Sequence, residues 1–140
     1  MAEFTSTTIQ TVAVGQNLPF TETAVKGTNC INHRAGAGNV TLRGLTNQCK
    51  ALFKVSFGGN IAIPTGGTVG AISVALAVGG EALNSATAIV TPAAVDQYSN
   101  VFMAVFVEVP RGCCVTVALK NTSAQAISIA NSNLIVERVA

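Results

Sequence analysis

The stretch VFMAVFVEV at residues 101–109 constrains the fold of this chain more than any other. Successive side chains of a β-strand point to opposite faces, so its valines and its methionine form one apolar face. Phe102, Ala104 and Phe106 form the other face, and Glu108 is the first charge on it. An antiparallel strand of a small sandwich normally keeps one face in contact with water. We therefore expect a second copy of the chain to cover the face that carries the two phenylalanines.

Alternation with a period of two dominates the rest of the sequence as well. Residues 48–57 place apolar and polar side chains on opposite faces, with Leu52 as the exception, which is typical of a half-buried strand. Residues 71–78 alternate large apolar side chains with small ones, which predicts close packing of the second face. No window shows the i, i+3, i+4, i+7 spacing of an amphipathic helix.

Turn-forming residues separate the apolar runs at short intervals. Gly79 and Gly80 lie between two such runs and predict a tight hairpin. About ten strands are expected, at residues 8–14, 18–20, 28–33, 39–43, 48–57, 69–78, 85–91, 99–109, 114–120 and 126–138. A break of the last strand at Asn131 is an alternative. This spacing predicts an all-β protein, an antiparallel β-sandwich of about ten strands.

The length and composition predict one domain that hides much of its surface. A chain of 140 residues fits a single domain, and only 10% of its residues are charged, against about 25% in a typical soluble protein. Ser, Thr, Asn and Gly are therefore expected to cover much of the surface, and partners the rest. We expect the domain at residues 9–140. Residues 1–8 are expected to form an N-terminal arm, ordered only if its own trimer or a larger assembly holds it.

Several partners are excluded by the charge and hydropathy pattern. The net charge is +2, and the eight basic residues are scattered, whereas nucleic-acid backbones are bound by clustered positive charge. No stretch reaches the roughly 18 apolar residues of a membrane-spanning helix, and the first ten residues lack the pattern of a secretory signal. We expect no nucleic-acid partner and no membrane partner, and we expect synthesis in the cytosol.

The four cysteines fit no zinc-binding pattern. Cys113 and Cys114 are adjacent, and Cys30 and Cys49 lie far from them in the sequence. We expect four free, mostly buried thiols that act as small apolar side chains. The alternatives are a Cys30–Cys49 link and an inter-subunit link through Cys113 or Cys114.

Catalysis finds little support in the residue types. A nucleophilic triad needs a histidine base, and the single histidine, His33, has only Asn32 and Arg34 beside it. The chain has one Asp, and its carboxylates fall on different expected elements. We therefore predict no enzyme, no catalytic residue, no metal and no cofactor. His33 is expected to cap a turn or to pack near a threefold axis; a threefold ring of His33 side chains around a metal is the alternative.

Four motifs in order along the chain carry a resemblance to a known family. They are Ile31-Asn32-His33 before a glycine-rich turn, the strand pair from Val74 to Glu81, Asn121-Thr122-Ser123, and the closing strand from Ile127 to Arg138. Over residues 9–140 the chain resembles the trimeric jelly rolls of the tumour necrosis factor and complement globular-head superfamily, in particular their bacterial and phage branch. Two departures are a Gly-Gly-Glu hairpin in place of Asn-Gly-Glu, and Cys49 near the place of an aromatic residue.

The resemblance implies a TNF-like jelly roll of about ten strands that forms a homotrimer. Its trimer interface would include Tyr98, Phe102, Phe106 and His33. The loops expected at residues 34–39, 58–68, 79–85 and 92–98 would face solvent. The residues expected to bind a host glycan or protein there are Arg34, Asn39, Asn60, Glu81 and Asp96.

The expected function is structural rather than catalytic. The first reading is a bacteriophage virion protein, a homotrimeric capsid decoration or head-fibre protein on the particle surface, made in the host bacterial cytoplasm. It would contact a capsid protein through the N-terminal arm and the base of the trimer. The alternative is a trimeric receptor- or carbohydrate-binding module of a tail fibre or bacterial surface, which one Tyr and no Trp make less favoured. A small hydrolase is a remote third reading.

Overall fold

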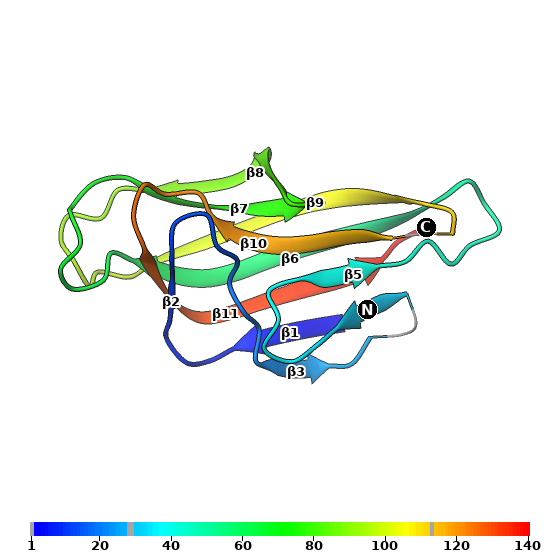
Figure 1. Ribbon diagram of the computed structural model, residues 1–140, viewed down its shortest axis with the longest axis horizontal. Helices are drawn as coiled ribbons and strands as arrows, with labels where there is room; N and C mark the ends of the chain where they lie inside the picture. Colours follow the sequence, from blue (N-terminus) through cyan, green and yellow to red (C-terminus); the bar gives the residue numbers. More distant parts are fainter. Residues whose placement is uncertain (1, 28–29, 113) are drawn as a thin grey trace.

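The computed structural model describes residues 2–27, 30–112 and 114–140. These residues form strands and loops, without a helix. The strands are β1 (Ala2–Ser6), β2 (Gln10–Val12), β3 (Glu22–Val25), β4 (Ile31–His33), β5 (Val40–Leu42), β6 (Lys50–Ala62), β7 (Ile72–Val78), β8 (Glu81–Val90), β9 (Ser99–Pro110), β10 (Val115–Asn121) and β11 (Ile127–Arg138). Most of them run along the long axis of the molecule (Figure 1).

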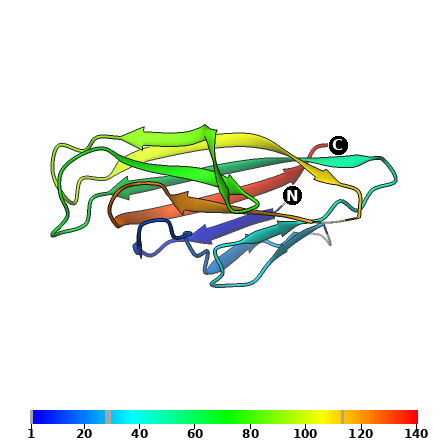
Figure 2. The same ribbon diagram turned by 45° about the horizontal axis from the view of Figure 1, so that its top comes forward.

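The strands form two antiparallel sheets that pack on each other as a sandwich. The first sheet has the order β3-β1-β11-β6-β9, with β2 also paired to β11, and the second has the order β4-β5-β10-β7-β8. Figure 2 shows the three long strands β6, β9 and β11 side by side in the first sheet. The predicted all-β sandwich of antiparallel strands is therefore confirmed.

The predicted strand boundaries differ from the observed ones in a few places. Residues 18–20 form no strand; instead Asn17 makes an isolated bridge to Lys120. Residues 58–62, expected in a loop, belong to β6 because each of them pairs with β9, with β11 or with both, which satisfies backbone groups. The last strand continues through Asn131, with a register shift between Ala130 and Asn133.

The N-terminal residues are part of the sandwich rather than an arm. Strand β1 pairs with β11 on one side and with β3 on the other. Its inward side chains, Ala2, Phe4 and Ser6, are buried. Their alternation with polar residues is the period-two pattern of a half-buried strand, hidden in a segment only five residues long. Residues 2–6 thus form a strand of the sandwich rather than an arm, and the expected contact with a capsid stays a prediction.

The core lies between the two sheets and uses one face of each long strand. Phe53 and Phe57 of β6 and Phe20 of the loop after β2 are its largest fully buried side chains. Burying one such side chain contributes roughly 1.5–3 kcal/mol. The odd-numbered side chains of β9 face this core: four of them are buried, and Val105 is partly buried. The core therefore takes only one of the two apolar faces that the sequence predicts for this strand.

The cysteines differ from the expectation of four free, buried thiols. Cys30 and Cys49 are free, and Cys49 is exposed, so the alternative Cys30–Cys49 link is not formed. Cys114 is exposed and disulfide-bonded, which makes the expectation wrong there. The prediction for Cys113 lies outside the described residues.

Candidate functional site

The outer face of the first sheet carries the candidate site. Cross-strand pairing places Phe102 of β9 beside Gly58 of β6, and Gly58 beside Asn133 of β11. Asn133 in turn pairs with Thr5 of β1. Because directly paired residues share a face of a sheet, one row crosses four strands from an aromatic ring to amide and hydroxyl groups.

A groove of about 490 Å³ follows this row, a volume within the range of small-ligand sites. Residues of four strands and of the segment after β1 line it: Glu3, Thr5, Thr7, Gly58, Gly59, Asn100, Phe102, Asn131, Ser132 and Asn133. We call it the sheet groove. Phe102 is its one aromatic lining residue in the described part of the chain, and 67% of its surface is exposed.

Two backbone features shape the sheet groove. A Cβ atom at Gly58 would lie 3.0 Å from Oδ1 of Asn133 and 3.9 Å from Cδ2 of Phe102, so the missing side chain leaves the space between them open. Asn131 has a φ of 52°, in the left-handed region that Asn tolerates better than most residues. It lies at the register shift of β11, and such bulges bend a strand and redirect its side chains.

The polar groups of the groove are held by hydrogen bonds. Nδ2 of Asn133 donates to Oε2 of Glu3 at 3.1 Å, and Nδ2 of Asn100 donates to Oδ1 of Asn60 at 3.2 Å. An amide side chain has two N–H donors and one oxygen acceptor, so each donating amide keeps further capacity for a ligand. The arrangement presents fixed donors and acceptors beside an exposed ring.

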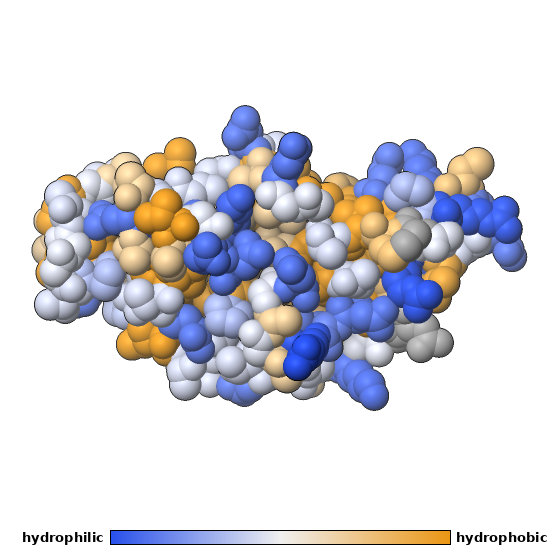
Figure 3. Space-filling view, in the orientation of Figure 1, coloured by the Kyte–Doolittle hydropathy of each residue, from blue (hydrophilic) through white to orange (hydrophobic). Residues whose placement is uncertain are grey.

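The charge around the groove is low. Glu3 is the charged residue among the described lining residues. Farther along the same face Lys50 and Glu108 form an ion pair at 2.6 Å, with side chains 59% and 61% exposed, and such surface pairs contribute little to stability. Figure 3 shows the opposite face of the molecule, over the second sheet, where hydrophilic and hydrophobic residues are mixed in small groups.

The structure brings together only part of the predicted trimer interface. Phe102 and Phe106 lie on the outer face of β9 and are 67% and 62% exposed, so the expectation that their own subunit leaves them uncovered is confirmed. Tyr98 directly precedes β9 and is 43% exposed. The trimer itself stays a prediction.

His33 lies apart from these three residues. It belongs to β4, an edge strand of the second sheet, whereas β9 is the edge of the first sheet farthest from β1 and β3. Its ring packs 4.5 Å from that of Phe4 and 6.4 Å from that of Phe20, measured between centroids. Nε2 donates to the carbonyl oxygen of Ala37 at 3.0 Å. The turn-capping role predicted for His33 is therefore confirmed.

The five residues predicted for binding loops do not form one cluster of contacts. Arg34 and Asn39 flank the turn that His33 caps, and Glu81 opens β8. Asp96 accepts a hydrogen bond from the Thr65 hydroxyl at 2.6 Å. Asn60 lies in a strand rather than a loop, beside the sheet groove.

Sequence reasoning missed most of the groove. Glu3 is expected in an arm and Gly58 in a loop, so the sequence does not predict that they share a face. The alternation of Asn131, Asn133 and Ile135 was a usable signal for an outward row on the last strand. The residues of other strands that lie beside this row depend on the strand order, which the sequence alone does not show.

The described residues contain neither a metal-binding cluster nor a membrane-spanning helix. No group of three His, Cys, Asp or Glu side chains is placed to hold a metal ion within residues 2–27, 30–112 and 114–140. The described segments also include no helix long and apolar enough to cross a membrane.

The comparisons with known proteins bear on the fold of this chain and not on its function. No protein-family model matches this sequence, and no curated protein matches it. The solved C-terminal domain of EclA, a sugar-binding protein, aligns with a TM-score of 0.37 and 15% identity over 79% of this chain and 85% of that chain. The CBM22-1 xylan-binding domain of Xyn10C from Paenibacillus barcinonensis aligns with a TM-score of 0.36 and 10% identity, over 99% and 87%. With identities and TM-scores this low, the ligands of those two domains give no argument about a ligand of this chain.

The predicted family is supported only at its coarsest level. The chain is a β-sandwich of two antiparallel sheets, the architecture that the resemblance implied. The finer parts of the predicted family stay predictions, namely the tumour necrosis factor superfamily, the phage branch and the threefold assembly.

Proposed function

We propose that this chain is a non-catalytic carbohydrate-binding module that holds its ligand in the sheet groove. One observation supports the proposal above the others. The exposed ring of Phe102 stands at one end of a row of fixed amide, hydroxyl and carboxylate groups on an otherwise uncovered sheet face. A binding site with this composition combines an apolar platform with a few polar groups that set orientation.

The chemistry of a sugar fits both parts of the groove. One face of a pyranose ring carries mostly C–H groups and packs against an aromatic ring, which has a large apolar surface. The hydroxyl groups at its edge are donors and acceptors, as are the amides of Asn100 and Asn133 and the hydroxyl of Thr5. Gly58 leaves room for a ring between Phe102 and Asn133.

The charge of the groove supports a neutral rather than an acidic sugar. The carboxylate of Glu3 accepts hydrogen bonds from hydroxyl groups and repels a uronic or sialic acid. Binding of a neutral ligand should then depend little on ionic strength, with less than about a twofold change between about 50 and about 500 mM NaCl, since salt screens charge–charge interactions.

A glycan array followed by titration calorimetry on the full chain tests this proposal. Phe102→Ala should weaken binding of the selected glycan by about two- to tenfold, the range expected for 0.5–1.5 kcal/mol of aromatic contact. Phe106→Ala is the matched control, because Phe106 lies on the same strand and face but outside the groove. No retained glycan, or equal loss in both variants, would contradict the proposal.

The second candidate is the homotrimeric structural protein of a bacteriophage virion, displayed on the particle surface. The observation that favours it is the exposed strip Phe102, Ala104 and Phe106 on one face of β9, which a second copy would cover. An obligate interface buries about 2,000 Å² or more, so this reading would place the sheet groove inside an assembly.

Mass measurement in solution separates the two candidates. A homotrimer at micromolar concentration, dissociated by Phe102→Glu and by Phe106→Glu alike, favours the structural protein. A monomer that binds a glycan through Phe102 alone favours the binding module. Cosedimentation with purified capsids tests the capsid partner directly.

A further inference from the structure

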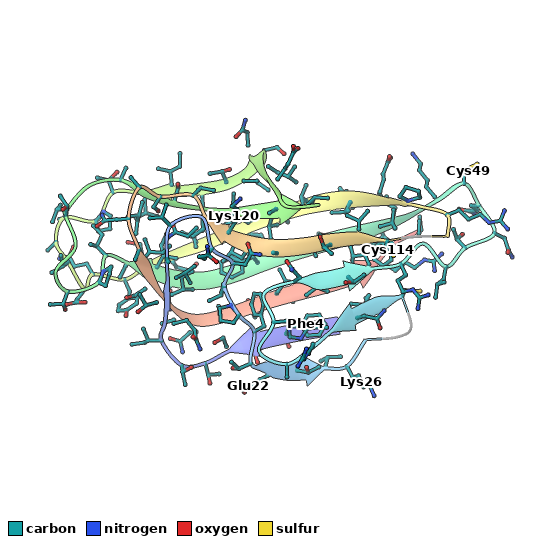
Figure 4. All side chains as sticks on the ribbon, in the orientation of Figure 1. Phe4, Glu22, Lys26, Cys49, Cys114 and Lys120 are labelled. Atoms are coloured by element: carbon teal, nitrogen blue, oxygen red, sulfur yellow. The ribbon has the colours of Figure 1, made fainter. Side chains whose placement is uncertain are left out.

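A second recess lies at the edge of the sandwich that is formed by β3 of the first sheet and β4 of the second sheet. It has a volume of about 400 Å³ and is lined by residues of β1, β3 and β4 and by Lys26 and Gly27, which directly follow β3. The side chains that matter here are Phe4, Thr23, Lys26, Ile31, Asn32 and His33. Figure 4 shows Phe4 on β1 and Lys26 just after β3. The recess shares no described lining residue with the sheet groove.

The floor of this edge recess is apolar and well held. Phe4 and Ile31 are 2% and 4% exposed. The imidazole of His33 packs on Phe4 and is anchored through Nε2 to Ala37, so the floor keeps its shape. Nδ1 of His33 is buried and has no hydrogen-bond partner in the described part of the molecule.

The rim is polar and carries one charge. Thr23, Lys26 and Asn32 are exposed, and no described carboxylate lines the recess. Glu22, the nearest carboxylate in the sequence, accepts a hydrogen bond from the Thr7 hydroxyl at 2.9 Å. The ion pair among the described residues joins Lys50 and Glu108. Lys26 lines the recess, and it forms no ion pair with a described residue.

We propose that the edge recess binds a small organic carboxylate with a compact apolar body. The ammonium of Lys26 would pair with the carboxylate, because a charge-assisted hydrogen bond is stronger than a neutral one. Asn32 and Thr23 add donors beside it. The apolar body would rest on the floor of Phe4 and Ile31, which distinguishes this ligand class from a bare inorganic anion. The inference is independent of the proposed carbohydrate binding.

Titration of the isotope-labelled full chain with sodium benzoate, followed by amide chemical shifts, tests the proposal. Benzoate should shift the amides of Thr23, Lys26 and Asn32 and saturate, whereas benzamide, which has the same ring without the charge, should not. Lys26→Gln should raise the dissociation constant at least about fivefold. Lys54→Gln, which removes an exposed charge on the outer face of the first sheet, should leave it unchanged.

Three results would overturn the proposal. One is binding of benzamide as tight as that of benzoate, which removes the role of the charge. Another is equal binding of inorganic phosphate at the same amides, which removes the role of the apolar floor. The third is a Lys26→Gln chain, folded by its amide spectrum, that binds benzoate as the unsubstituted chain does.

Discussion

Both faces of β9 carry large apolar side chains, but their environments are opposite. The odd-numbered side chains from Val101 to Val109 pack into the core, and most of them are 6% exposed or less. The outward Phe102 and Phe106 are more than 60% exposed. Only the inward face contributes hydrophobic free energy to folding, because an apolar side chain stabilises the fold when it is buried. The second face is available for another molecule.

The small-residue face of β7 behaves differently from the outer face of β9. Ala75 and Ala77 point away from the core, yet they are 0% and 2% exposed. Ala75 lies between Lys120 of β10 and Thr87 of β8 in the sheet, and these longer side chains shield it. The chain thus covers a small-residue face by itself, but it cannot hide a phenylalanine at the edge of the sheet. The predictions below test this difference between covered and uncovered faces.

The largest expected effect is a difference in the free energy of unfolding between variants on the two faces of the first sheet. Phe53→Ala should lower the free energy of unfolding by about 3–5 kcal/mol, because it leaves a cavity in the core. Phe106→Ala should change it by no more than about 0.5 kcal/mol, as for an ordinary surface position. Urea denaturation at low protein concentration measures both. A large loss for Phe106→Ala would mean that a second copy covers the outer face.

Filling the sheet groove should have the next largest effect, on binding rather than on folding. Gly58→Val places a side chain between Phe102 and Asn133, and we expect at least about a tenfold loss of affinity for the glycan selected on the array. Ser56→Val, two residues along the same face of β6, is the control for adding a β-branched side chain, which strands accept well. Equal losses in the two variants would argue against a ligand in the groove.

Removing one polar group from the sheet groove should weaken ligand binding less than filling the groove does. Asn133→Ala deletes an amide that contacts Glu3, and one hydrogen bond contributes about 1 kcal/mol. We expect about a fivefold rise in the dissociation constant, measured by calorimetry, with the free energy of unfolding changed by no more than about 1 kcal/mol. Asn47→Ala, at an exposed amide outside the groove, should not alter binding.

The smallest expected effect concerns the ion pair on the outer face. Lys50→Met removes the partner of Glu108, and the free energy of unfolding should fall by about 0.2–1 kcal/mol, because both side chains are mostly exposed. Raising the salt concentration should shrink the difference between the two chains. A loss above about 2 kcal/mol, beyond the usual range of exposed pairs, would show that this region is shielded from water, as in an assembly.

The sequence predicted the strands better than the site. The alternating runs predict four of the strands to within one residue at each end, namely β5, β9, β10 and β11, because a side-chain period of two is visible without any partner. Short strands such as β1 and β3 have too few alternations to stand out. Their pairing with β11 and with each other comes from contacts far apart in the sequence.

By itself the sequence determined that this chain is an all-β sandwich and that one strand presents phenylalanines on a second apolar face. Both follow from local alternation, which needs no knowledge of neighbours. Only the tertiary structure decided that Glu3, Gly58, Phe102 and Asn133 meet on one surface, and that His33 lies at the other edge. Strand order and register set these neighbours, and they depend on pairing between distant segments that no local pattern encodes.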